Sequence, residues 1–141
     1  MTHTPARKQD PQAEVTAKVT GGCLCEAVRL FLTGAPKRVG LCHCMDCRKH
    51  HGAVFYAAAV FAPEVVTITG TTHCFRDRHF CPTCGSSVFA RTDDEVEVHL
   101  GALDQPSRWP PSYELWTTRR EAWLPELPNT ETLPKNRGGD R

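Results

Sequence analysis

The feature that most constrains this chain is its set of eight cysteines, because seven of them fall into three short groups. A chain of 141 residues has the size of one domain and can bury only a modest core. Cysteines this dense therefore fix the fold either as a disulfide framework or as metal ligands. The three groups are Cys23 with Cys25; Cys42, Cys44 and Cys47; and Cys81 with Cys84.

The cysteine spacing favours metal over disulfides. Neighbours two residues apart form strained bridges, and the first twenty residues contain no apolar segment typical of a secretory signal. An unexported chain keeps its thiols reduced, so we expect a cytoplasmic protein whose thiols bind metal. A framework of four disulfides is the alternative.

Charge and hydropathy exclude several classes of partner. The chain has 17 Lys+Arg against 16 Asp+Glu, a net charge of +1, which gives no electrostatic reason to bind nucleic acid or an anionic membrane. Apolar runs such as residues 57–62 are far shorter than the roughly 18 residues of a membrane span. We therefore expect neither nucleic acid nor a membrane among its partners. The oligomeric state has no signature in the sequence.

The pattern between the chain ends predicts a mainly β protein. Short β-branched, aromatic or alternating runs are separated by prolines and glycines, which suits small antiparallel sheets tied together by metal. A short helix is expected at residues 46–52, with Gly52 as its C-terminal stop. We predict a disordered leader at 1–18, a domain at 19–128 and a flexible tail at 129–141. The predicted strands are residues 27–32, 55–61, 65–68, 87–90 and 95–100.

Two of the cysteine groups predict a structural zinc site. Cys23 and Cys25 would point to the same face of an extended segment, and Cys81 and Cys84 have the spacing of a zinc-knuckle turn, with Gly85 free to adopt a positive φ. Together they complete a tetrahedral Cys₄ set. Such a site would clamp the start of the domain to its middle and contribute directly to folding.

The middle group predicts a second zinc ion with an open position. Cys42, Cys44 and Cys47 can supply three thiolates from one loop, and three protein ligands plus an exchangeable fourth are typical of catalytic zinc. One alternative is a closed site in which His43, His50 or His51 is the fourth ligand. Another alternative is an iron–sulfur cluster.

Other conspicuous residues are expected to be structural. Cys74 is the cysteine left over and is expected to be an inert, half-buried thiol. His99 is expected to be a solvated residue on the polar face of its strand. The three tryptophans occur at a spacing of seven, and we expect them to pack on the core rather than stack on a ligand: Trp109, Trp116 and Trp123.

These motifs resemble the glutathione-dependent formaldehyde-activating (GFA) family, also called the CENP-V/GFA domain family. The likeness lies in residues 21–25, 42–49 with Gly52, and 80–86, and continues in a GxLD turn at 101–104 and a C-terminal segment at 113–116 and 123–128. It covers about residues 20–128. Glu26 departs from the pattern, since the family usually has glycine there, and the His50–His51 pair is not part of it.

The resemblance implies a fold of small antiparallel sheets around zinc, similar to Rab-associated exchange chaperones. It implies two Zn²⁺ per chain, one structural and one catalytic, with glutathione as co-substrate. The implied reaction condenses formaldehyde with glutathione to S-(hydroxymethyl)glutathione, which is classed as a carbon–sulfur lyase activity. The implied ligands are Cys23, Cys25, Cys81 and Cys84 for the structural zinc, and Cys42, Cys44 and Cys47 for the catalytic zinc.

Three functional hypotheses follow from the sequence. The first is a zinc enzyme that joins a thiol to a small aldehyde, because an open zinc would stabilise a bound thiolate beside the carbonyl. The second is a zinc-binding module for a protein partner, without catalysis. The third is a thiol-binding protein without turnover. A thiol competing for the second metal is expected under the first and third hypotheses only.

Overall fold

The computed structural model describes residues 2–4 and 19–138, and its architecture is mainly β, as predicted. A three-stranded antiparallel sheet has the order β2-β3-β6. Its strands are β2 (Val19–Gly22), β3 (Arg29–Leu32) and β6 (Val66–Thr69). None of the helices in the described ranges combines the length and the apolar character that a membrane span requires.

The second sheet has nine strands in the order β1-β7-β8-β9-β10-β5-β4-β11-β12. It is antiparallel except at one edge, where β11 pairs in parallel with both β4 and β12. This sheet is larger than the pattern suggested, because many of its strands are too short to show an alternation. Its strands are β1 (Thr2–Thr4), β4 (Arg38–Cys42), β5 (Tyr56–Phe61), β7 (Thr72–Phe75), β8 (Arg78–Phe80), β9 (Ser87–Arg91), β10 (Val96–His99), β11 (Tyr113–Leu115) and β12 (Glu131–Thr132).

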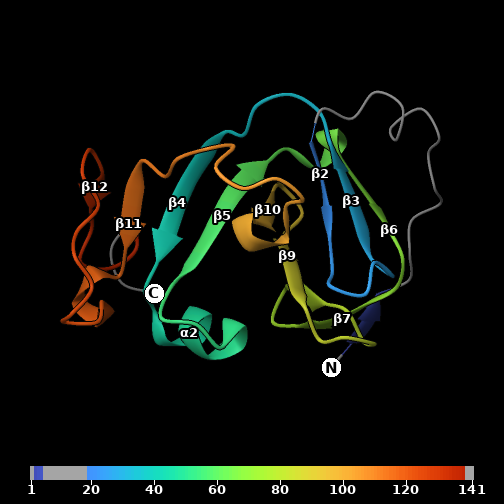
Figure 1. The fold of residues 1–141 in the computed structure, drawn as a ribbon, viewed down its shortest axis with the longest axis horizontal. Helices are drawn as coiled ribbons and strands as arrows, with labels where there is room; N and C mark the ends of the chain where they lie inside the picture. The colour runs from blue at the N-terminus through green and yellow to red at the C-terminus, as the bar shows by residue number, and fades with distance from the viewer. Residues whose placement is uncertain (1, 5–18, 139–141) are drawn as a thin grey trace.

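The predicted helix is confirmed as α2 (Met45–His51), which lies below the ends of β4 and β5 (Figure 1). Gly52 caps it in the left-handed conformation, with φ 61°, and donates its backbone N–H to the carbonyl of Arg48. Each of the five predicted strands contains or overlaps an observed one, namely β3, β5, β6, β9 and β10. Three short 3₁₀ turns complete the fold: η1 (Pro63–Val65), η2 (Leu100–Ala102) and η3 (Thr117–Arg119).

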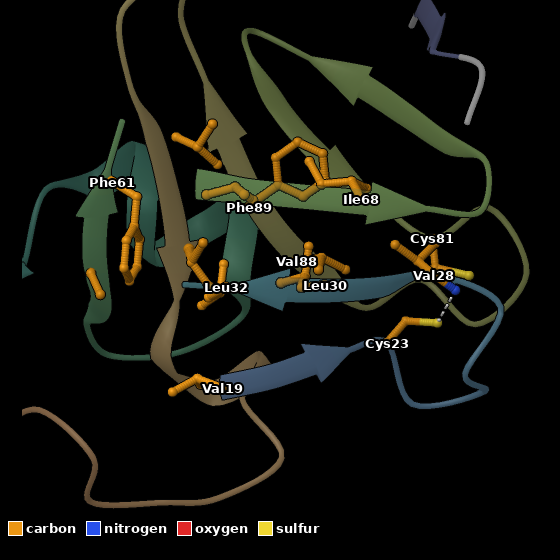
Figure 2. Packing of buried hydrophobic residues seen from close by; sticks show 14 of the residues in the cluster. Val19, Cys23, Val28, Leu30, Leu32, Phe61, Ile68, Cys81, Val88 and Phe89 are labelled. Carbon is orange, nitrogen blue, oxygen red and sulfur yellow. Dashed lines mark hydrogen bonds between the residues drawn. The ribbon is translucent and has the colours of Figure 1, made fainter. Parts of the chain in front are cut away.

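The hydrophobic core combines apolar side chains of both sheets. Leu30 and Leu32 of β3 are fully buried and belong to the same cluster as Phe61 of β5 and Phe89 of β9. Figure 2 shows that Cys23 and Cys81 lie at one end of this cluster, beside Val28. Burial of these side chains is the main driving force for joining the sheets. The first cysteine cluster is thus continuous with the core.

The chain ends differ in part from expectation. Thr2–Thr4 pair with β7 as β1, and the rest of the predicted leader lies outside the described residues. Residues 129–138, predicted to be a flexible tail, run along the edge of the large sheet and form β12. The reason is that β11 would otherwise leave an unpaired edge, and β12 supplies backbone partners that its polar sequence does not reveal. The last three residues of the predicted tail, 139–141, lie outside the described residues.

Candidate metal centres and their cavity

The first cluster brings together the four thiols of Cys23, Cys25, Cys81 and Cys84, whose sulfur atoms all lie within 4.8 Å of one another. Cys23 and Cys25 follow β2, and the other two lie in the turn between β8 and β9. That turn is closed by the N–H of Gly85, which donates to the carbonyl of Cys81 at 2.8 Å. Gly85 has φ 79°, the positive value that the spacing predicted.

The sulfur spacing of this cluster fits a tetrahedral ion. Cys25 Sγ lies 3.6 Å from Cys23 Sγ and 3.7 Å from Cys81 Sγ. A tetrahedron with Zn–S bonds of about 2.3 Å has edges of about 3.8 Å. The two S–S distances match such an edge, so this cluster has the size of a zinc site.

Neighbouring donors point at the sulfur atoms of three thiols of this cluster. The backbone N–H of Val28 points at Cys23 Sγ at 3.2 Å, and that of Thr83 points at Cys81 Sγ at 3.4 Å. The Ser86 hydroxyl lies 3.2 Å from Cys84 Sγ and lowers the pKa of that thiol to about 5. Hydrogen bonds to a thiolate offset its burial, as expected for a metal ligand.

The second cluster joins the sulfur atoms of Cys42, Cys44 and Cys47, again within 4.8 Å of one another. Cys42 ends β4, Cys44 is the N-cap of α2, and Cys47 lies in the first turn of that helix. Cys44 Sγ accepts the backbone N–H of Cys47 at 3.3 Å. A thiolate at this position is favoured by the helix N-terminus, so the loop is built for anionic sulfur.

The three thiols of the second cluster share negative charge unequally. Hydrogen bonds from Cys42 and Cys47 lower the pKa of Cys44 to about 2, and the same contact with Cys44 raises the pKa of Cys42 to about 12. The pKa of Cys47 is also raised by its two neighbours. One sulfur thus ionises at the expense of the others, and a cation at the centre would let all three ionise together.

A cavity of about 530 Å³ opens at the second cluster and is lined by all three of its cysteines. This volume lies within the range of small-molecule sites. Its floor is one face of β4, β5, β10 and β11. Gly40 is required in that floor, because a Cβ there would lie 2.1 Å from the ring of Tyr113. The polar and aromatic residues of its lining are Asp46, Tyr56, Arg78, Glu97, Tyr113, Trp116, Arg119 and Asn136.

Tyr56 and Glu97 form a polar pair inside this cavity. Tyr56 lies opposite Cys42 in the β4–β5 register, and its hydroxyl donates to Glu97 Oε2. Burial and the carboxylate of Glu97 raise the pKa of Tyr56 well above its usual range, so its hydroxyl stays protonated. The imidazole of His51 stacks on the Tyr56 ring, with 4.7 Å between ring centroids. The pair therefore places a protonated phenol, whose hydrogen is donated to Glu97, in the same cavity as the thiols.

A buried ion-pair network holds the loop between the thiols. His43 is fully buried, and its Nε2 lies 3.0 Å from Glu114 Oε1, while Arg120 donates to Glu114 Oε2 at 2.9 Å. Burial alone would raise the pKa of Glu114, but the contacts with His43 and Arg120 hold it below its usual value. The network ties the backbone between Cys42 and Cys44 to β11.

The histidines left open by the sequence do not join the second cluster. Among the described residues, the sets of close ligand atoms contain no histidine nitrogen. His43 bonds Glu114, and His50 and His51 contact each other at 5.1 Å between ring centroids. The three thiols thus form the candidate set by themselves.

Two sequence expectations need correction. His99 is 4% exposed rather than solvated, because β10 is an interior strand and the rings of Tyr56 and His51 pack on His99. Of the tryptophans, Trp109 packs against Phe61 of the core. Trp123 is 69% exposed, and Trp116 lines the cavity, so neither packs on the core as expected.

Several cavity residues escaped the sequence analysis altogether. Tyr56, Arg78, Glu97 and Arg119 belong to four separate elements, and only the strand pairing brings them together. One signal was present for Tyr56, which is the one side chain with a polar group in a predicted strand that is otherwise apolar.

Comparison with known proteins identifies the family of this chain. The family described as "Glutathione-dependent formaldehyde-activating enzyme" matches residues 18–119. No curated protein sequence matches the chain. A solved protein of Rhodobacter sphaeroides, a structural-genomics target, is 24% identical, with a TM-score of 0.49 over 63% of this chain and 91% of its own. With 18–119 matched, well over half of its length, the chain belongs to the glutathione-dependent formaldehyde-activating (GFA) family.

Proposed function

We propose that this protein is a zinc-dependent enzyme that joins a thiol such as glutathione to a small aldehyde such as formaldehyde. The observation that carries the proposal is the three-thiol cluster at the wall of a ligand-sized cavity. A closed structural site would have no need of such a cavity. The reducing conditions that this chemistry needs favour a cytoplasmic location.

In this proposal the two clusters have different roles. Cys23, Cys25, Cys81 and Cys84 hold a structural zinc ion, which their sulfur spacing supports. Cys42, Cys44 and Cys47 hold the catalytic one, and their metal supplies stabilisation of an incoming thiol in its thiolate form.

The residues of the cavity bind and orient the reactants. In the reaction, the thiol sulfur forms a bond to the carbonyl carbon, the C=O π pair becomes the lone pair of an alkoxide, and a proton converts this to a hydroxyl. The thiol loses one proton when its sulfur attacks, and the alkoxide takes up one proton, so the reaction has no net proton change. The Tyr56 hydroxyl has one hydrogen, which it donates to Glu97 in the free protein. In this proposal the hydroxyl turns from Glu97 and donates that hydrogen to the aldehyde oxygen when the reactants bind.

Charge in the cavity supports a thiol that carries carboxylates. Arg78 and Arg119 both line it, and guanidinium groups bind carboxylates through paired hydrogen bonds. Asp46 and Glu97 supply negative charge for an amine in the same space. Glutathione carries two carboxylates and one amine, so its charges match those of the lining.

The test is the rate at which formaldehyde and glutathione exchange with S-(hydroxymethyl)glutathione, followed by exchange NMR at equilibrium. Protein loaded with zinc is expected to speed the exchange above the spontaneous rate. Cys44→Ser should abolish the acceleration, whereas Cys74→Ser, outside both clusters, should retain it. An exchange rate equal to the spontaneous one, despite two bound zinc ions, would contradict the enzyme and leave thiol binding without turnover or a partner-binding module.

A further inference from the structure

One wall of the cavity comes from a part of the chain outside the family match. The match ends at residue 119, yet Asn136 lines the cavity together with Trp116 and Arg119. In Figure 1 this C-terminal segment passes along the sheet edge as β12, next to β11. A feature beyond the matched residues can distinguish this protein from others of its family.

Backbone hydrogen bonds fix the segment to the cavity. Leu133 N–H donates to the carbonyl of Glu114 at 2.9 Å, and Thr117 N–H donates to the carbonyl of Leu133 at 3.1 Å. Trp116 N–H donates to the carbonyl of Lys135 at 3.2 Å. The segment therefore runs beside η3 residue by residue and is part of the folded wall.

The contact between Trp116 and Asn136 is the centre of this wall. Trp116 Nε1–H donates to Asn136 Oδ1 at 2.8 Å. Trp116 has φ 55° and ψ 45°, a left-handed conformation that a non-glycine residue rarely adopts. Such strain persists only where surrounding contacts enforce it, and it concentrates at ligand sites. The segment thus holds the Trp116 backbone in a conformation it would not adopt alone, and Asn136 holds the indole at the cavity.

The same wall carries a cation. Arg119 is exposed, and among the described residues no ion pair with a carboxylate is found for it. Its carbonyl accepts a hydrogen bond from Arg48 of α2 at 2.9 Å, and Arg48 also pairs with Glu121. The backbone of Arg119 is thereby fixed while its guanidinium remains available to a ligand at the cavity.

We propose that residues 133–136 determine thiol specificity by holding Trp116, beside Arg119, against the part of the ligand remote from its sulfur. This inference rests on the proposed function of the cavity. The wall selects a peptide-sized thiol with a carboxylate, because the indole offers a stacking surface and the guanidinium an anion partner. A small neutral thiol reaches the three cysteines without touching this wall.

The test compares the binding of glutathione and 2-mercaptoethanol to zinc-loaded protein by calorimetry. Asn136→Ala removes the acceptor for Trp116, and Trp116→Phe removes the donor while keeping an aromatic ring. Each is expected to weaken glutathione about five- to tenfold, the effect of one lost hydrogen bond and its ordering, with 2-mercaptoethanol unchanged. Thr132→Ala, in β12 and outside the cavity lining, is the matched control and should change neither affinity.

The outcomes separate this inference from the proposed function. Unchanged glutathione affinity in both variants, or equal loss for both thiols, would overturn the wall as a specificity determinant while the thiol site stands. If the unaltered protein binds neither thiol, the proposed function fails and the specificity wall fails with it. Zinc content, measured on every variant, shows whether the fold has been kept.

Discussion

The two cysteine clusters use the same chemistry and differ in how the chain assembles them. The first draws its thiols from segments more than fifty residues apart, Cys25 and Cys81 being 56 apart, and it lies at the end of the hydrophobic core. The second draws its thiols from one loop at the start of a helix, beside a cavity. A metal held by ligands distant in sequence links separate parts of the fold, so its loss should destabilise the protein. A metal held by ligands from one loop should contribute less to folding, and it can take part in a reaction without unfolding the protein. The predictions below test this difference.

The largest expected effect is the loss of a ligand from the first cluster. Cys81→Ser is expected to cost more than about 5 kcal/mol, comparable to the whole stability of a typical domain, because a metal that links distant segments contributes to folding free energy. Thermal unfolding followed by circular dichroism should show no cooperative transition.

The matched variant in the second cluster is Cys44→Ser. Serine is itself a good helix N-cap, so α2 should persist and the cost should stay below about 2 kcal/mol. This variant is expected to unfold cooperatively with one zinc ion instead of two. Equal destabilisation by Cys81→Ser and Cys44→Ser would erase the distinction between the clusters.

The next effect concerns turnover at the second cluster. Tyr56→Phe removes the hydroxyl that Glu97 orients in the cavity. We expect an exchange rate about 10²-fold lower, typical of a lost proton donor, with both zinc ions retained. An unaltered rate would exclude this hydroxyl from the reaction.

A similar or smaller effect is expected from the network behind the second cluster. Glu114→Gln keeps the size of the side chain and removes the charge that pairs with His43 and Arg120. Zinc affinity at the second cluster should fall about 10- to 100-fold, while the first cluster keeps its metal. Competition with a chelator measures both affinities in one sample. Weakening of the first site instead would show that the network supports the fold and not the loop.

The smallest effect concerns the loop of the first cluster. Glu26 has φ 69°, a left-handed value, and this explains why the family usually has glycine there. Glu26→Gly is expected to stabilise the protein by about 1 kcal/mol, since relief of strain exceeds the added freedom of the unfolded chain. Thermal unfolding measures the gain. A lower melting temperature would mean that the Glu26 side chain makes a stabilising contact.

The features that could be predicted from the sequence are those that the spacing of nearby residues controls. Both cysteine sets, the helix ending at Gly52 and the alternating strands are local patterns, and the structure contains all of them. Three-residue strands such as β8 and β11 were missed, because an alternation cannot be recognised over three residues. β12 was missed because its polar residues pair only through the backbone.

The cavity was beyond prediction because strand order creates it. His99 seemed solvated from its neighbour Glu97, and only the tertiary packing of the His51 and Tyr56 rings on His99 shows that it is buried. Arg78 and Asn136 lie far apart in the sequence and have no motif in common, yet they line the same cavity. Long-range pairing decides such neighbours, and no local pattern encodes it.

The most direct test of the central claim is the release of metal from the folded protein. Zinc content is measured first, and release is then followed during titration with a chelator, with and without glutathione. We predict two zinc ions per chain: one that leaves while the protein stays folded and whose release responds to glutathione, and one that leaves only on unfolding. Release of both ions in a single step, indifferent to glutathione, would contradict the division between a structural and a reactive site.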